Sequence, residues 1–184
     1  MKKKIAALLL AAMMCTLAAC GAKDATADDE TNDKDTLVVA MELAYPPFET
    51  KDADGNPSGV SVDFAKAFGE YIGKDVVIEN IAWDGLIPAL QTGKADMVMS
   101  SMTITDERKE KVDFSEPYAN ALLALLTNKD SGITSIEDMN VEGRKIAVKT
   151  GSTGYFYAQK NLPNAEIIAL ADESACVTEV AQGK

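Results

Sequence analysis

No histidine occurs among the 184 residues of the chain. Histidine is the side chain that most often acts as a general base near neutral pH, and it is a common ligand of zinc. Its absence removes the usual catalytic base and the usual zinc site together. The sequence therefore predicts no catalytic residues, no metal site and no cofactor.

Cysteine is also scarce, with Cys15, Cys20 and Cys176 as its three occurrences. We expect Cys15 to leave with an N-terminal signal and Cys20 to be acylated, for reasons given below. Only Cys176 would then remain in the mature chain, which excludes an intramolecular disulfide. Its neighbours offer neither metal-ligand spacing nor an adjacent base, so we interpret it as a structural or incidental thiol.

Positive charge is in short supply, because 18 lysines and arginines face 29 aspartates and glutamates, for a net charge of −11. An acidic surface argues against nucleic acid as a partner, and against electrostatic adhesion to anionic lipid. The charge of a small ligand does not follow from this balance, since a single site can oppose the field of the whole protein.

A long apolar run is present at the N-terminus, where residues 5–17 follow three lysines at positions 2–4. The run is too short to cross a bilayer as a mature helix, and it has the pattern of a secretory signal. Small residues at 18–19 then lead into Cys20. We therefore predict a signal peptide over residues 1–19.

Cys20 falls in the stretch 17–21, LAACG, which resembles the bacterial lipobox. In proteins with this motif the cysteine thiol is acylated and the cysteine becomes the new N-terminus. The alternative is an ordinary signal peptide followed by a coincidental cysteine. Residues 20–35 favour lipidation, because they contain no large apolar side chain and have the composition of a disordered tether.

From residue 36 onward, predicted strands alternate with predicted helices. Strands are expected at 37–41, 76–81, 95–99, 121–127, 145–148 and 165–170, a turn at 52–57, and helices at 61–72, 83–90 (ended by Gly93), 153–160 and 172–182. This alternation is typical of an α/β fold with parallel sheets. We divide it into a first lobe at 36–125 and a second lobe at 126–184.

Open α/β sheets bind ligands at the carboxyl ends of their strands. Glu42, Tyr45 and Phe48 follow the first predicted strand, and the prolines at 46–47 make that turn rigid. A ring held in this way is a stiff platform for the aliphatic part of a small molecule. The alternative is that Tyr45 and Phe48 are core residues beneath the turn.

Polar residues also follow the third predicted strand, at 100–108, SSMTITDER. Four hydroxyls lie there just before a predicted helix start, with Thr105 in the N-cap position. Arg108 would project from the first turn, where a guanidinium can bind a carboxylate through two parallel hydrogen bonds. The alternative is that Arg108 belongs to a solvated run of charges with residues 109–111.

A third polar segment, TGSTG at 150–154, follows a predicted strand and opens a predicted helix. Backbone N–H groups at a helix N-terminus bind anions, and a carboxylate fits as well as a phosphate. The alternative is a plain turn with an N-cap. Together, two anion-binding segments, an aromatic platform and a row of hydroxyls describe a cleft for a zwitterion, without a nucleophile–base pair.

Five stretches carry a resemblance to a known family: AYPPFE at 44–49, GVSVDFA at 59–65, WDGLIPALQ at 83–91, DMVMSSMTITDER at 96–108 and VDFSEPY at 112–118. In order and spacing they are similar to the polar-amino-acid-type periplasmic binding proteins of ABC transporters, bacterial solute-binding protein family 3. The resemblance runs from about residue 36 to the end. It implies a type II periplasmic-binding-protein-like fold, in which two α/β lobes close on a solute and deliver it to a membrane permease.

The resemblance also implies which residues hold the amino and carboxyl groups of a bound amino acid. Ser101 and Thr103 are at positions that hydrogen-bond the ligand's ammonium and carboxylate. Arg108 is at the position of the partner of the α-carboxylate. Ser152 and Thr153 are at positions from which the second lobe adds contacts to the same carboxylate.

For the ligand's side chain, the resemblance implies that Tyr45 stacks on it, that Trp83 forms a second aromatic wall and that Glu42 faces it. A desolvated carboxylate needs a hydrogen-bond donor, so Glu42 favours a polar or cationic side chain. Glutamine, arginine, lysine and histidine all supply a donor, and we rank the cationic three ahead of glutamine.

The sequence departs from the family pattern at its end. Members follow a Gly-Lys pair like residues 183–184 with another strand, which usually brings an aspartate for the ligand's ammonium. Neither that strand nor the return to the first lobe follows here. We therefore expect a truncated second lobe and weak binding by this chain alone.

The leading hypothesis is a lipid-anchored, extracytoplasmic solute-binding protein of the cell envelope, which captures a free amino acid and passes it to an ABC permease. Its partners would be the amino acid, the permease and, through the N-terminal lipid, the membrane. One alternative is a dehydratase-like enzyme on the same fold, and another is the ligand-sensing module of a membrane receptor.

Overall fold

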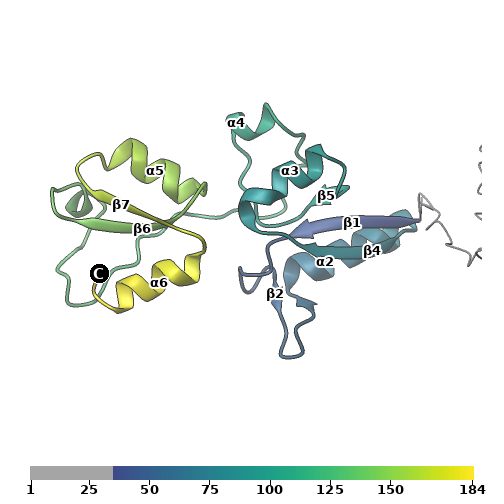
Figure 1. Cartoon of the computed structure of the whole chain (residues 1–184), viewed down its shortest axis with the longest axis horizontal. Coiled ribbons are helices and arrows are strands. Elements are labelled where there is room, and N and C mark those ends of the chain that lie inside the picture. Colours follow the sequence, from purple (N-terminus) through teal and green to yellow (C-terminus); the bar gives the residue numbers. More distant parts are fainter. Residues whose placement is uncertain (1–34) are drawn as a thin grey trace, which may run out of the picture. The chain divides into compact units, whose positions relative to one another are not determined.

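The computed structural model describes residues 35–184. The predicted signal peptide at 1–19, the predicted lipidation site Cys20 and the tether up to residue 34 lie outside the described residues. Between 35 and 184 the chain forms two separate parallel sheets with helices beside them, as Figure 1 shows. No helix within this range combines the length and apolar character needed to cross a membrane.

The first sheet has β1 (Thr36–Met41) at its centre, with β4 (Asp75–Asn80) and β5 (Met97–Val98) paired in parallel on either side. The chain passes from β1 to β4 through α2 (Val60–Ile72), and from β4 to β5 through α3 (Leu86–Gln91). The strands predicted at 37–41 and 76–81 and the helix predicted at 61–72 are confirmed, and β5 is shorter than the strand predicted at 95–99.

Strand β1 is covered on both faces. Leu37, Val39 and Met41 belong to one buried cluster, which they share with side chains of α2. Ala40 points the other way, into a second cluster that contains Leu86 of α3. This alternation explains why the sequence of β1 is apolar throughout, because a strand between two helical layers has no polar face.

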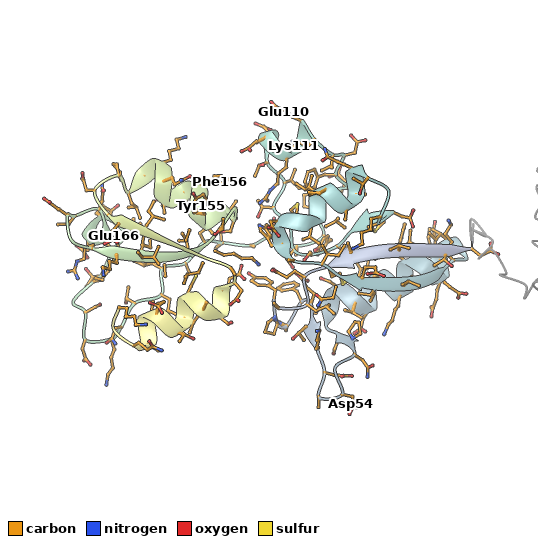
Figure 2. All side chains as sticks on the ribbon, viewed as in Figure 1. Asp54, Glu110, Lys111, Tyr155, Phe156 and Glu166 are labelled. Atoms are coloured by element: carbon orange, nitrogen blue, oxygen red, sulfur yellow. The ribbon has the colours of Figure 1, made fainter. Side chains whose placement is uncertain are left out.

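A small hairpin precedes α2, formed by β2 (Thr50–Lys51) and β3 (Pro57–Ser58). Its tip contains Asp54, labelled in Figure 2. The carboxylate of Asp52 accepts hydrogen bonds from the backbone N–H groups of Asp54 and Asn56, which closes the loop. The predicted turn at 52–57 is thereby confirmed.

The second sheet pairs β6 (Lys145–Lys149) in parallel with β7 (Glu166–Leu170). Helix α5 (Thr153–Asn161) connects the two strands, and α6 (Glu173–Ala181) follows the second. The 3₁₀ turn η2 (Glu137–Met139) precedes β6 in the chain and contributes Met139 to the core beside this sheet. The buried side chains of its core cluster are Met139, Ala158 and Leu162.

Two expectations need correction. The apolar segment 121–127 is not a strand, because no strand in the part of the chain that the structure describes pairs with it. Leu122 is 95% exposed, whereas Leu125 packs against the core of the second sheet. Apolar composition predicted a strand here, but a strand requires a neighbour with which to share backbone hydrogen bonds.

The helix predicted at 83–90 is instead divided. A 3₁₀ turn, η1 (Trp83–Gly85), leads into α3. The predicted end is confirmed, since Gly93 has φ +74° and its N–H bonds to the carbonyl of Leu90. Trp83 therefore lies at the edge of the helix, where its ring is free to face the ends of the strands.

We expect Leu86→Ala to lower the free energy of unfolding by about 2–5 kcal/mol, because Leu86 is fully buried and its truncation leaves a cavity. Leu122→Ala is the matched control and should change the stability by less than about 0.5 kcal/mol, given its exposure. Urea unfolding can be followed by the fluorescence of Trp83, the sequence's only tryptophan, which packs against the cluster of Leu86. Equal midpoints for the two variants would contradict the assignment of this core.

Candidate functional site

Candidate ligand-binding residues lie beyond the carboxyl ends of three strands. Glu42 and Tyr45 follow β1, residues 100–108 follow β5, and residues 150–154 follow β6. The structure brings groups from all three segments into contact, as the position of ligand sites in α/β sheets leads one to expect.

Tyr45 lies in the tight turn after β1. It is bridged to Glu49 by two backbone hydrogen bonds of 2.7 and 3.1 Å. Its ring stacks on that of Phe48, with 6.1 Å between centroids, and 38% of the residue is exposed. Tyr45 is therefore exposed at the surface rather than buried in the core, and Phe48 packs against it from a partly buried position.

Arg108 lies in α4 (Asp106–Lys109), which Thr105 caps by accepting a hydrogen bond from the N–H of Arg108. Only 8% of Arg108 is exposed, so its alternative assignment to a solvated run of charges is wrong. Nη1 donates to the carbonyl of Thr103 at 2.7 Å, and Nη2 donates to the carbonyl of Gly151 at 3.1 Å. The guanidinium thus joins the segments that follow β5 and β6.

No carboxylate in residues 35–184 forms an ion pair with Arg108. Burial lowers the pKa of its guanidinium, and the charge of Glu107 offsets this only in part. A buried cation without a counter-ion is costly, and an arriving anion would relieve that cost. The arrangement is therefore suited to bind a carboxylate.

Ser101 adopts a left-handed backbone conformation with φ +50°. Its hydroxyl donates to Oε2 of Glu49 at 3.1 Å, and its backbone N–H donates to the hydroxyl of Tyr118 at 3.2 Å. Both donors of Ser101 are thus engaged within the protein. What remains for a ligand is acceptor capacity, at the carbonyl oxygen and the hydroxyl lone pairs.

Hydroxyl groups from the segments that follow β5 and β6 also lie close together. Ser152 caps α5 by accepting a hydrogen bond from the N–H of Tyr155 at 3.2 Å, so the segment TGSTG does open a helix, as predicted. The hydroxyl of Thr153 lies 3.4 Å from that of Thr103. These contacts bring four of the predicted ligand-binding residues (Thr103, Arg108, Ser152 and Thr153) into one small region.

Lys149, the last residue of β6, lies at the centre of the candidate site and was not predicted from the sequence. Its side chain is 3% exposed, and its ammonium donates to Glu42 and, at 3.1 Å, to Glu173 of α6. Burial alone would lower its pKa, but the hydrogen bonds to Glu42 and Glu173 raise the pKa of Lys149 above its ordinary value. A lysine at the end of a strand, directly before TGSTG, was the signal that could have revealed it.

Trp83 lies among these charges. Its backbone N–H donates to Oε1 of Glu42 at 3.2 Å. The ammonium of Lys149 is 4.8 Å from the ring centroid, and the guanidinium carbon of Arg108 is 5.4 Å from it. Both cations are stabilised by the ring, so Trp83 connects the surroundings of Arg108 to the pair formed by Glu42 and Lys149.

Two other kinds of chemical group were considered in the sequence, a metal site and the thiol of Cys176. Between residues 35 and 184, no group of three or more acidic or cysteine side chains is placed to hold a metal ion. Cys176, on α6, donates a hydrogen bond to the carbonyl of Asp172, and burial raises the pKa of its thiol, which disfavours the thiolate. Cations, hydroxyls and aromatic rings instead offer recognition of a small polar molecule.

Comparison with known proteins identifies the family of the chain. Residues 37–180 match the description of bacterial extracellular solute-binding proteins, family 3. The chain belongs to this family. It is 39% identical over 166 residues to a probable histidine-binding protein of Neisseria gonorrhoeae, covering 89% of this chain and 61% of the relative. It is 36% identical to the arginine-binding extracellular protein ArtP of Bacillus subtilis, covering 83% and 57%.

Among solved structures, an ancestral amino acid-binding protein, described as a precursor of cyclohexadienyl dehydratase, is 44% identical. It superimposes with a TM-score of 0.79 and covers 84% of this chain and 69% of its own length. The predicted α/β fold of the type II periplasmic-binding-protein class is thereby confirmed. The chain spans about three fifths of the length of the first two solute-binding relatives.

The Glu42–Lys149 pair yields a testable prediction. In a double-mutant cycle of Glu42→Gln with Lys149→Met, we expect a coupling of about 1–3 kcal/mol in the free energy of unfolding, because both side chains are largely withdrawn from water. Lys145→Met, at an exposed position of the same strand, is the matched control and should show no coupling to Glu42→Gln. Urea unfolding measures both cycles, and equal couplings would show that the pair is not formed.

Proposed function

We propose that this family member is the extracytoplasmic amino-acid receptor of an ABC importer. The observation that carries the proposal is Arg108, a buried guanidinium without a carboxylate partner in residues 35–184, beside hydroxyls from both sheets. The relatives from Neisseria gonorrhoeae and Bacillus subtilis are named for histidine binding and arginine binding, which supports the same class of ligand.

Arg108 would bind the α-carboxylate of the amino acid. Its planar guanidinium can present two parallel donors, and the carbonyls of Thr103 and Gly151 already hold it in place. The hydroxyls of Thr103 and Thr153 would add neutral donors to the same carboxylate. Ser152 would contribute through the helix terminus that it caps, where backbone dipoles favour an anion.

The ammonium group would lie near Ser101. Because both donors of Ser101 are engaged, this residue offers acceptors, which match an ammonium and not a carboxylate. Separate positions for the two charged groups would orient the amino acid, with its side chain directed toward Tyr45, Trp83 and Glu42. Tyr45 would stack on that side chain and Trp83 would form the second wall.

Glu42 favours a ligand with a polar or cationic side chain, and Lys149 refines this proposal. Since Lys149 already donates to Glu42, a ligand must share or replace that contact. Arginine, lysine, histidine and glutamine each carry a donor for Glu42, whereas an aliphatic side chain would desolvate the pair without compensation.

The remaining assignments follow from this proposal. Lobes at 36–125 and 126–184 would close on the amino acid, and the loaded protein would engage an ABC permease. The protein would have no catalytic role, and recovery of unchanged amino acid after incubation would distinguish it from a dehydratase-like relative. The complete reading frame would distinguish it from a receptor module, which requires a membrane-spanning segment after the domain.

A thermal-shift panel of the twenty amino acids tests the ligand class on the full-length protein. We expect the largest stabilisation from arginine, lysine, histidine or glutamine. Arg108→Lys should then weaken binding of the best ligand by about 2–5 kcal/mol in calorimetry, because a lysine cannot replace a two-donor contact to a desolvated carboxylate. If arginine proves best, agmatine, which lacks the α-carboxylate, should bind the unmodified protein as poorly as arginine binds the variant.

Lys109→Met is the control, since this neighbouring side chain is 57% exposed and should leave the affinity unchanged. Leucine or glutamate as the best stabiliser would refute the role of Glu42. Equal affinity of Arg108→Lys and the unmodified protein would refute the role of Arg108.

We also propose that Cys20 is acylated and anchors the protein to the membrane. The support is the LAACG stretch and the polar composition of the tether. Mature protein should then leave membranes with detergent but not with a salt wash, since an acyl anchor is held by the apolar interior of the bilayer. Cys20→Ser should abolish this retention, and a processed variant that stays on membranes would refute the anchor.

A further inference from the structure

Glu49 is a fully buried carboxylate directly beneath the candidate site, with 0% of the residue exposed. Its Oε2 accepts hydrogen bonds from the hydroxyls of Ser61, at 2.6 Å, and Ser101, at 3.1 Å. Its Oε1 is buried as well, and among the described residues nothing hydrogen-bonds to it. A buried carboxylate with an unsatisfied oxygen lowers the stability of the fold, whereas an apolar side chain such as leucine would carry no such desolvation cost at this position.

Three segments meet at this carboxylate. Glu49 ends the turn that carries Tyr45, to which it is bridged by backbone hydrogen bonds. Ser61 lies in the first turn of α2, and its N–H bonds to the carbonyl of Phe48. Ser101 lies in the loop after β5. The side chain of Glu49 therefore fixes two segments relative to each other. One is the turn that carries Tyr45, the proposed aromatic contact of the ligand, and the other is the loop that carries Ser101, the proposed polar contact.

Ser101 has the conformation that needs such support. In the range 35–184 it is the one residue other than glycine with a positive φ. A side chain makes this region of backbone space unfavourable, so surrounding contacts must hold it there. Those contacts are the hydrogen bond from its hydroxyl to Glu49 and the one from its N–H to Tyr118.

We propose that Glu49 is a positioning residue of the ligand site, which holds Ser101 in its left-handed conformation and fixes it relative to Tyr45. The importance for binding rests on the proposed function, whereas the hold on Ser101 does not. Burial raises the pKa of Glu49, and the hydrogen bonds from Ser61 and Ser101 partly counteract this rise. The two serine hydroxyls are therefore the contacts that stabilise the buried carboxylate.

The test compares Glu49→Gln, Ser101→Ala and Ser101→Gly with the unmodified full-length protein. Amide hydrogen exchange at residue 101 is measured without ligand, and affinity for L-arginine, L-histidine and L-glutamine is measured by calorimetry. Glu166→Gln is the matched control, because Glu166 is exposed on β7 and is labelled in Figure 2. We expect Glu49→Gln and Ser101→Ala to speed exchange, and to weaken binding, at least tenfold.

The pair at position 101 separates positioning from general stability. Both variants lose the hydroxyl, but glycine tolerates a positive φ and alanine does not. Ser101→Gly should therefore exchange more slowly and bind several-fold more tightly than Ser101→Ala, a comparison that remains decisive if Glu49→Gln does not fold. Equal behaviour of the two variants, or unchanged exchange in Glu49→Gln, would overturn the proposal.

If the unmodified protein binds none of the three amino acids, the proposed function fails for these ligands. Faster exchange in Glu49→Gln and Ser101→Ala would still establish that Glu49 holds Ser101, and unaltered exchange would refute it. Faster exchange with unchanged affinity would show that Glu49 stabilises the conformation of Ser101 but that ligand binding does not depend on this conformation. That result would also overturn the proposal.

Discussion

A buried cation without its counter-ion is the constraint around which the site is organised. Arg108 is withdrawn from water, and two backbone carbonyls satisfy hydrogen bonds of its guanidinium. Carbonyl dipoles do not cancel a net charge, and no carboxylate of residues 35–184 pairs with it. The nearby carboxylate of Glu42, by contrast, already has Lys149 as its partner. Under the proposed function, the carboxylate of a bound amino acid would supply the ion-pair partner that the described carboxylates do not provide.

The same residues connect the two sheets. Arg108 reaches the carbonyl of Gly151, Thr103 meets Thr153, and Lys149 reaches Glu42, so each contact joins a group after a strand of the first sheet to a group of the second. A ligand that enters must therefore replace or share contacts that hold the sheets together. Binding and the arrangement of the two sheets are consequently linked in free energy, since a ligand shifts that arrangement by as much as it binds one form more tightly than another.

Local patterns were sufficient for most elements. The apolar run of β1 predicted a strand buried on both faces, Thr105 predicted a helix start, and the segment TGSTG predicted another, all of which the structure confirms. The prediction failed at 121–127, where apolar residues have no strand to pair with in the described range. Lys149 was missed because its meaning depends on Glu42, 107 positions away, and no local pattern reports such a contact. Sequence therefore identified single residues of the site, whereas their pairing required the fold.

The pairing of Glu42 has a consequence for the choice of ligand. Lys149 lies between two carboxylates, and Glu173 is 41% exposed and screened by water, whereas Glu42 is only 13% exposed. The cluster of Glu42, Lys149 and Glu173 retains one negative charge beside the ring of Trp83. A cationic side chain would neutralise that charge and could stack on the ring. A neutral amide would accept from Lys149 and donate to Glu42, which satisfies both without changing the net charge. If the chain binds an amino acid as proposed, the buried pair would therefore favour a polar side chain over an aliphatic one, because an aliphatic group offers no hydrogen bond to Lys149 or to Glu42.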